Sequence, residues 1–405
     1  MKKFPLFLAI LFTQIGFTQR LPSIEEVISL RSVGGVALSP DGKNVSFTVQ
    51  STDWNENRFD SEVWLSKNGS SPFQLTNTSK GSSTSPLFSP DGKWIAFLTD
   101  RGSKNQIYVV RTEGGEARAM TKEEEGVSFF EWHPDGRRFI FVKPEKEDKN
   151  KKEREKRYGL YEVDDKEFGL SHLWQVDFNP DQRDPSELPC YESVDSLKVK
   201  AGCIEWPKSK RLTEGKFTVT SFLISPDGNH IAFGHQPDPL INSSIKSDIS
   251  LFDFATRKVT PLVTNLSSDG LEDWSPDSKE ILFTSNLNDS TSNFYQNRKL
   301  FVITLSDRNQ RQLAKNLDEN LGGFQWRASG IYGSLPNKTL RPLYKIDPKT
   351  GNHSIFMNSP DQIFGLTFTK AGDRFAFTGR DFDQLTEVFV SPVNSPKPEK
   401  ITNLS

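Results

Sequence analysis

The sequence predicts an all-β protein, a seven-bladed β-propeller, from a repeated turn, a repeat length of about fifty residues and the absence of helical periodicity. The turn is a phrase with the pattern S-P-D-G, which is followed each time by alternating apolar residues. Its copies begin at Ser39, Ser89, His133, Ser225 and Ser275, with a weaker copy at Thr369. Two further short apolar runs follow most copies, so each repeat supplies four short antiparallel strands, which is typical of a propeller blade.

The repeated phrase is a tight turn between two strands. Proline presets φ at the first corner, aspartate bonds to its own backbone, and glycine accepts a positive φ. After the turn, apolar residues recur at two fixed offsets, such as Ile95 and Phe97, and the residue between them is small or apolar in every copy. We therefore expect both faces of this strand to be buried between stacked sheets, with all of the turns at one rim of the ring.

The first eighteen residues are expected to be a secretory signal peptide. Two lysines precede an apolar run that is too short to span a bilayer, and a buried first strand is the alternative. No cysteine follows the run, so no lipid anchor is implied. The expected location is therefore the periplasm or the extracellular space.

Residues 19–32 form a lead-in segment outside the repeat, and residues 33–405 form the propeller. Ser23 is expected to cap a short helix within residues 22–32, with Ile24 and Val27 on its apolar side. A closed propeller offers little surface to cover this stripe, so we expect it to remain exposed.

Blade three carries two expected insertions, at about residues 143–170 and 179–207. In the first, thirteen of the fifteen residues from 143 to 157 are charged, and we expect a solvated hairpin tip or loop. A nucleic-acid site is not favoured, because the run has a net charge of only +3 and no interleaved aromatic residue. The second insertion holds Cys190 and Cys203, which are either disulfide-bonded or two unpaired thiols.

Composition excludes several classes of partner. The formal net charge is −2, which favours neither nucleic acid nor an anionic membrane as a partner. The five histidines are scattered without the spacing of metal ligands, so neither a metal nor another cofactor is expected. A length of 405 residues usually means two or three domains, but here the repeat runs almost from end to end.

Candidate catalytic residues are not found in this chain. No G-x-S-x-G pattern occurs, and the nearest stretch, residues 81–85, lacks the closing glycine and leads into a strand. The acidic residues Glu162, Asp164 and Asp165 are candidate contacts for a substrate amine, although the polar edge of an inserted element would have the same composition.

Several segments together resemble the N-terminal propeller of the prolyl oligopeptidase family of serine peptidases. They are SPDGKWIAFLTDR at 89–101, IYVVRTEGGEARAMT at 107–121, YGLYEVDDKEFGLSHLWQVD at 158–177, and the closing EVFV and KITNLS. The order of these segments is similar to the acylaminoacyl-peptidase and dipeptidyl-peptidase branch, and it covers nearly all of residues 22–405. The S-P-D-G repeats alone are less specific, since TolB-type periplasmic propellers share them.

The resemblance implies a propeller that admits only short peptides to an α/β-hydrolase domain, which carries the catalytic serine, aspartate and histidine. That domain is expected beyond residue 405, so no catalytic residue is assigned here and the chain alone is expected to be inactive. A fragment, a split gene and a genuine loss of the hydrolase partner all fit this pattern. The alternative function is a stand-alone TolB-like periplasmic propeller that binds protein partners on its rims.

Overall fold

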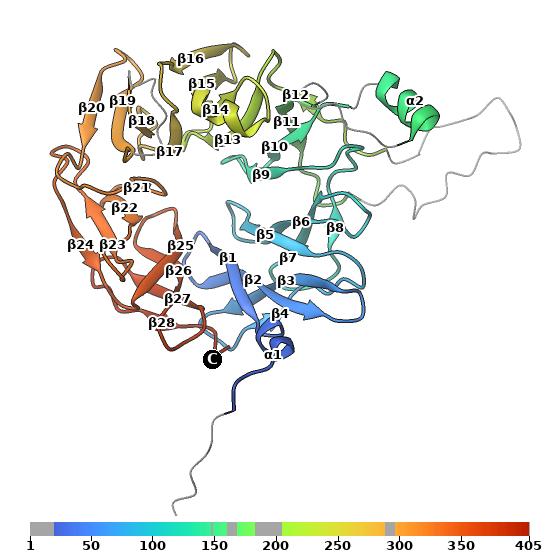
Figure 1. Ribbon diagram of the computed structural model, residues 1–405, viewed down its shortest axis with the longest axis horizontal. Coiled ribbons are helices and arrows are strands. Elements are labelled where there is room, and N and C mark those ends of the chain that lie inside the picture. Colours follow the sequence, from blue (N-terminus) through green and yellow to red (C-terminus); the bar gives the residue numbers. More distant parts are fainter. Residues whose placement is uncertain (1–19, 147–148, 160–167, 183–204, 288–295, 405) are drawn as a thin grey trace, which may run out of the picture.

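Seven antiparallel sheets are arranged in a ring around a central channel in the computed structural model (Figure 1). The structure describes residues 20–146, 149–159, 168–182, 205–287 and 296–404. Every sheet has four strands that are consecutive in the chain, and the first strand of each blade lies nearest the channel. The predicted seven-bladed propeller is therefore confirmed.

The strands of each blade begin within a few residues of the positions that the repeat predicts. Blades one and two contain β1 (Ser32–Leu38), β2 (Asn44–Asp53), β3 (Arg58–Lys67), β4 (Phe73–Gln74), β5 (Ser83–Phe88), β6 (Trp94–Thr99), β7 (Gln106–Arg111) and β8 (Arg118–Ala119). Blades three and four contain β9 (Phe129–Trp132), β10 (Arg138–Pro144), β11 (Ser171–Asp177), β12 (Lys210–Arg211), β13 (Thr218–Ile224), β14 (His230–Gln236), β15 (Asp248–Asp253) and β16 (Val259–Val263). Blades five to seven contain β17 (Gly270–Trp274), β18 (Glu280–Ser285), β19 (Lys299–Thr304), β20 (Gln310–Leu313), β21 (Gln325–Arg327), β22 (Gly330–Ser334), β23 (Leu343–Ile346), β24 (His353–Met357), β25 (Gln362–Phe368), β26 (Arg374–Arg380), β27 (Glu387–Pro392) and β28 (Glu399–Lys400).

The repeated turn joins the first and second strands of a blade through one serine hydroxyl. In blade one, Ser39 Oγ donates to Asp41 Oδ1 at 2.6 Å and accepts from the backbone N–H of Asn44 at 2.9 Å. This bond holds the pKa of Asp41 below its usual value. Gly42 has a φ of 70°, a backbone conformation that glycine adopts without the steric strain that a Cβ atom would cause. The aspartates of the repeat are turn formers, as the sequence predicts.

Blade three performs the same turn with His133 in place of serine, and the histidine also joins two blades. Its Nε2 lies 2.9 Å from the carbonyl oxygen of Gly228, in the turn of blade four. A side chain on Gly228 would clash with the imidazole, since its Cβ would lie 2.9 Å from a ring carbon. His133 is therefore a buried structural residue.

In four of the blades, a threonine that follows the fourth strand forms hydrogen bonds with the backbone and with a side chain of the third strand. We call this arrangement the threonine clamp. In blade seven, Thr402 Oγ1 accepts from the backbone N–H of Val388 at 2.9 Å and donates to the buried carboxylate of Glu387. The side chain bonded to the threonine hydroxyl is Glu62 in blade one, Gln106 in blade two, His172 in blade three and Glu387 in blade seven. The buried carboxylates and the amide of this clamp therefore have partners, which keeps their burial from costing stability, whereas His172 Nε2 is buried without a hydrogen-bond partner among the described residues.

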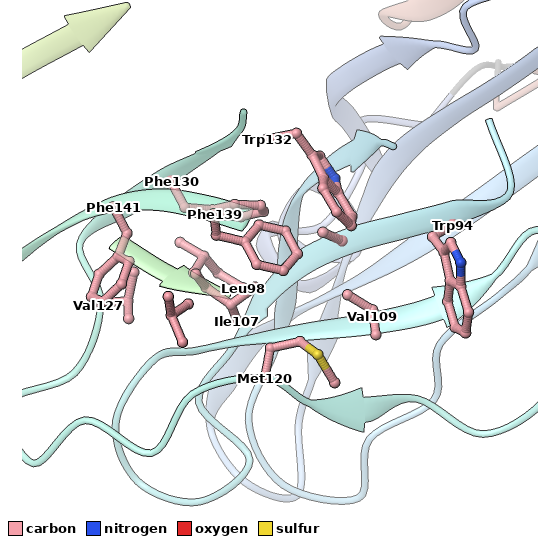
Figure 2. Close-up of a cluster of buried hydrophobic side chains, with 12 residues drawn as sticks. Trp94, Leu98, Ile107, Val109, Met120, Val127, Phe130, Trp132, Phe139 and Phe141 are labelled. Atoms are coloured by element: carbon pink, nitrogen blue, oxygen red, sulfur yellow. The ribbon is translucent and has the colours of Figure 1, made fainter. Parts of the chain in front are cut away.

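The second strands are buried on both faces, as predicted. Ile95, Ala96 and Phe97 are all fully buried in blade two. Figure 2 shows the core between blades two and three, where Trp94 and Val109 of blade two face the Trp132 and Phe139 side of blade three. Such apolar layers between neighbouring blades are the main source of stability in a fold whose strand pairing is confined to single blades.

The ring is closed by side-chain packing, because blades one and seven do not exchange a strand. Phe47 and Val49 of blade one pack with Val388 and Val390 of blade seven in one buried cluster. A cavity of about 500 Å³ opens beside this seam and reaches from Trp64 to the residues around Thr402.

The charged insertion of blade three differs from the expected loop or hairpin tip. It forms the helix α2 (Lys149–Tyr158), which projects outward from the ring (Figure 1). Lysine, arginine and glutamate are good helix formers, and glutamates lie four residues from basic residues in this run. Among the helices of the described residues, none is both long and apolar enough to cross a membrane.

Candidate functional site

The repeated turns gather around one end of the channel, and we call this end the turn rim. They surround a cavity of about 450 Å³. Its lining includes Pro40, Pro90, Pro134, Pro226, Pro276 and, in the weaker sixth copy, Lys370. The prediction that the turns share one rim is confirmed. Because each first strand runs toward this rim, the loops between the second and third strands lie at the opposite end, which we call the loop rim.

The loop rim carries most of the exposed apolar surface. Among the described residues, all but Phe73, Val259 and Ile355 of the exposed large apolar side chains lie there or in the segment leading to it. They are Leu21, Ile24, Val27, Ile28, Leu30, Trp54, Phe59, Tyr158, Phe168, Ile241, Ile245, Leu266, Phe364 and Phe382. The exposed apolar side chains are therefore distributed unequally between the two rims.

The lead-in helix α1 (Ile24–Ile28) begins with a capping box, in which the Ser23 hydroxyl accepts from the N–H of Glu26 and the Glu26 carboxylate accepts from the N–H of Ser23. It is shorter than the expected span because Ser29 already caps its C-terminal end. The stripe predicted to be exposed is indeed exposed: Ile24 is 75% and Val27 52% accessible.

Blade one holds this helix by polar bonds and leaves its apolar side free. Thr52 Oγ1 donates to the carbonyl oxygen of Ile28 at 2.5 Å, and Trp54 Nε1 donates to Ser29 Oγ at 3.1 Å. Both anchors come from the end of β2 and the loop that follows it. The helix is therefore attached to the rim through its C-terminal turn, with an apolar stripe available for another surface.

The channel wall is almost entirely uncharged. Among the seven first strands, the ionisable residues are Glu131 in β9, Glu272 and Asp273 in β17, and Arg327 in β21. Asp273 Oδ2 accepts from Arg327 Nη1 at 2.9 Å, and a Glu272 oxygen accepts from the N–H of Phe324 at 3.0 Å. Burial raises the pKa of both carboxyl groups, and the Arg327 guanidinium opposes this rise at Asp273.

Two acidic–tryptophan pairs, Glu131–Trp132 and Asp273–Trp274, each connect three blades. Trp274 Nε1 donates to the carbonyl oxygen of Leu223 in the preceding blade at 3.0 Å, and Asp273 accepts from the N–H of Trp326 in the following blade. The pair in blade three repeats this pattern with Leu87 before it and Ile224 after it. Both pairs could have been found from the sequence, since each one immediately precedes a copy of the turn phrase.

Glu131 differs from Asp273 in having no cationic partner among the residues that the structure describes. One oxygen accepts from the N–H of Ile224 at 3.3 Å, and this is the hydrogen bond that the structure gives the carboxyl group. Burial, with a smaller contribution from the negative charge of Asp273, raises the pKa of Glu131 to about 8. The side chain is therefore mostly a neutral carboxylic acid at pH 7.

The site residues named from the sequence fall outside the described residues. Glu162, Asp164 and Asp165 lie in residues 160–167, and Cys190 and Cys203 lie in residues 183–204. Their proposed amine contacts and disulfide therefore stay predictions. The part of the chain that the structure describes contains no group of three or more side chains placed to hold a metal ion.

Comparison with known proteins agrees with this architecture. A family model described as TolB beta propeller domain matches residues 22–159. The seven-bladed propeller is therefore built from TolB-like repeats. The propeller is 25% identical over 336 residues to dipeptidyl-peptidase 5 of Porphyromonas gingivalis, a match that covers 81% of this chain and 48% of the relative. It is 30% identical over 225 residues to the uncharacterized peptidase YuxL of Bacillus subtilis, covering 53% of this chain and 31% of the relative.

Among solved structures, the acylaminoacyl peptidase of Pyrococcus horikoshii superposes with a TM-score of 0.65 at 15% identity, covering 93% of this chain and 53% of that one. At this identity the similarity concerns the fold. The chain spans 31% and 48% of the length of these two curated relatives. It is thus related to the propellers of prolyl oligopeptidase-type peptidases, as the sequence predicts.

Proposed function

We propose that this propeller gates access of short peptides to an α/β-hydrolase domain that docks on the loop rim, and that together they form a serine exopeptidase. The observation that carries the proposal is the asymmetry of the two rims. The turn rim is built from tight turns with few exposed apolar side chains, whereas the loop rim presents α1, Trp54 and Phe382 to solvent. A surface of this kind is suited to a permanent partner domain.

The relatives support the same proposal. The named relatives are peptidases, and the aligned region accounts for about half or less of their length. A ring with a narrow channel would exclude folded proteins and leave short peptides as substrates. The catalytic serine, aspartate and histidine would be supplied by the partner domain, since no G-x-S-x-G pattern occurs in this chain.

Export to the periplasm or the extracellular space is part of the proposal. It rests on residues 1–18, whose two lysines and short apolar run have the composition of a signal peptide. N-terminal sequencing of the protein recovered from its host should begin after residue 18. A mature protein that retains Met1 would remove this part of the proposal.

The first test reads the DNA that follows codon 405, where a continuous or adjacent reading frame with a G-x-S-x-G pattern is expected. The purified 405-residue chain should neither hydrolyse peptides nor react with a fluorophosphonate probe, because no activated serine is present. Labelling that a serine-directed inhibitor prevents would contradict the proposal. Specific partner proteins without hydrolase sequences would favour the stand-alone propeller instead.

The second test measures docking. The propeller is co-expressed with the encoded hydrolase domain or, if the region encodes none, with the part of P. gingivalis dipeptidyl-peptidase 5 that this chain does not match. The double variant Ile24→Ser, Val27→Ser should reduce co-purification and peptide release at least tenfold. The matched control is Phe73→Ser, because Phe73 is also exposed, at 42%, but lies at the turn rim. Equal losses in both variants would remove the loop rim as the docking surface.

A further inference from the structure

Glu131 and Asp273 occupy the same position in blades three and five. Each lies two residues before the first residue of a turn phrase, and each precedes a tryptophan. Each also accepts a backbone N–H from the first strand of the following blade, from Ile224 for Glu131 and from Trp326 for Asp273. The two carboxyl groups therefore occupy corresponding positions, although the glutamate side chain is one methylene longer and Asp273 also accepts from the backbone N–H of Trp274.

The two sites differ in the residue that follows the donor of this N–H group. After Trp326 comes Arg327, which forms the ion pair with Asp273. After Ile224 comes Ser225, whose hydroxyl donates to Asp227 within its own turn at 2.6 Å. Blade four thus supplies the backbone half of the site and lacks the cation that completes it in blade six.

The space beside Glu131 is large enough for a ligand. Glu131 lines a cavity of about 590 Å³ in the channel wall of blades one to three. Its other lining residues are mostly apolar or aromatic and include Val36, Leu87, Phe88, Phe129 and Phe130. The side chain retains partial solvent access there.

No ionisable side chain of β1, β5, β13 or β25 balances this carboxyl group, because these strands contain none. The ionisable groups on the other first strands are Glu272, Asp273 and Arg327, and Arg327 is already paired with Asp273. A single carboxyl group in an apolar cavity is the arrangement that recognises a cation attached to an apolar body.

We propose that this channel cavity binds a primary ammonium ion that carries an apolar or aromatic group, with Glu131 as its counter-ion. The ammonium would take the place at Glu131 that the Arg327 guanidinium takes at Asp273. The aromatic side chains would cover the apolar part of the ligand and add cation–π attraction. This inference does not depend on a hydrolase domain, since the cavity belongs to this chain.

Binding of the ammonium ion is expected to change the protonation state of Glu131. At pH 7 the neutral Glu131 acid would lose its proton when the ammonium binds, forming a carboxylate–ammonium pair and releasing one proton to solvent. The affinity for an alkylammonium ion should therefore increase as the pH is raised toward 8 and level off above it, while Asp273 remains neutralised by Arg327. The affinity for a peptide should fall again above about pH 8, because its own α-amino group then loses its proton.

The test is isothermal titration of the purified chain with phenethylammonium and, in parallel, with the tripeptide Phe-Gly-Gly. The N-acetylated form of each probe keeps the aromatic group and removes the charge. Glu131→Gln should weaken binding of at least one cationic probe tenfold or more. The matched control is Glu113→Gln, at an 87% exposed side chain outside the channel, and it should leave the affinity unchanged.

A measurement on the unaltered chain keeps the proposal testable if Glu131→Gln does not fold. Titrations at pH 7 in buffers of different ionisation enthalpy should show up to one proton released per ligand bound. Detection of binding by a cationic probe, lost on acetylation and accompanied by proton release, supports the proposal. Absence of binding by both cationic probes, equal binding of acetylated forms, or wild-type affinity in Glu131→Gln would overturn it.

Discussion

Trp274 at the turn rim and Trp54 at the loop rim are the same residue type in opposite surroundings. Trp274 is 2% exposed and its indole bonds to the preceding blade, whereas Trp54 is 52% exposed and bonds to the lead-in segment. Neighbouring blades close over the first side chain, and nothing in the described ring closes over the second. The comparison teaches that one rim holds the ring together while the other is free to carry an interaction surface.

The largest expected difference comes from truncating these two tryptophans. Trp274→Ala should lower the free energy of unfolding by about 3–5 kcal/mol, because it leaves a cavity between blades four and five and removes the indole hydrogen bond to Leu223. Trp54→Ala should change it by less than about 0.5 kcal/mol. Urea unfolding followed by circular dichroism measures the free energy of unfolding of both variants. Similar losses in the two variants would contradict the proposed difference between the rims.

The next effect depends on pH and concerns the threonine clamp of blade three at the loop-rim end of the sheet. Burial, together with the nearby Arg211 charge, lowers the pKa of His172 to about 4, although Glu145 and Glu214 oppose this shift. In the clamp, Thr213 Oγ1 accepts from the backbone N–H of Leu173 at 3.0 Å and lies 3.3 Å from Nδ1 of His172.

Because the pKa of His172 in the folded chain lies below that of the unfolded chain, its contribution to stability is complete above about pH 6.5 and is lost as the pH falls toward 4. The expected loss is about 1.4 kcal/mol per pH unit within this window. His172→Gln should remove this dependence, because Gln106 fills the same place in blade two. Unfolding free energies of the two proteins at several pH values between 4 and 7 provide the measurement, and parallel curves would count against it.

A smaller effect is expected from the clamp of blade seven. Thr402→Val keeps the shape of the side chain but removes the hydroxyl that bonds to Glu387, a residue only 1% exposed. The free energy of unfolding should fall by about 1–3 kcal/mol, since a buried carboxylate loses a donor. Thr402→Ser restores the hydroxyl and should recover most of the loss. Failure of serine to do so would indicate that methyl packing matters more than the hydrogen bond.

The smallest effect on stability is expected at α1. Replacing Ile24 and Val27 by serine should change the free energy of unfolding by less than about 0.5 kcal/mol, because both side chains are already exposed. The same change should reduce the binding of a hydrophobic fluorescent dye to the isolated chain. A large destabilisation would mean that the stripe is covered by the propeller in solution, and it would remove the contrast between the rims.

Local chemistry made the blades predictable from the sequence. The S-P-D-G turn is decided within six residues by a serine hydroxyl, an aspartate and a positive φ, so its position marks the same two strands in each blade that carries it. Blade five shows the limit of this rule, because Ser278 adopts a φ of 62° where other copies have glycine. The hydroxyl–carboxylate bond of Ser275 and Asp277 is retained there at 2.7 Å.

Contacts between blades were harder to predict. The hydrogen bond from Ile224 to Glu131 joins residues that are far apart in the chain. No local sequence pattern predicts the angle at which one blade packs against the next. The exposed stripe of α1 was predictable from its period, but its anchoring by Thr52 and Trp54 was not. The helix α2 was not predicted, because a run of lysine, arginine and glutamate is compatible both with a solvated loop and with a helix.

The ring closure between blades one and seven has a consequence for the order of folding. Strand pairing within each blade is local in sequence, apart from the insertion in blade three, so blades can form one after another as the chain emerges from the ribosome. The packing of Phe47 against Val388 joins residues about 340 positions apart and must await the seventh blade. Until then the apolar side of the first blade has no neighbour, and this interval is when the nascent chain is most exposed to aggregation and most dependent on chaperones.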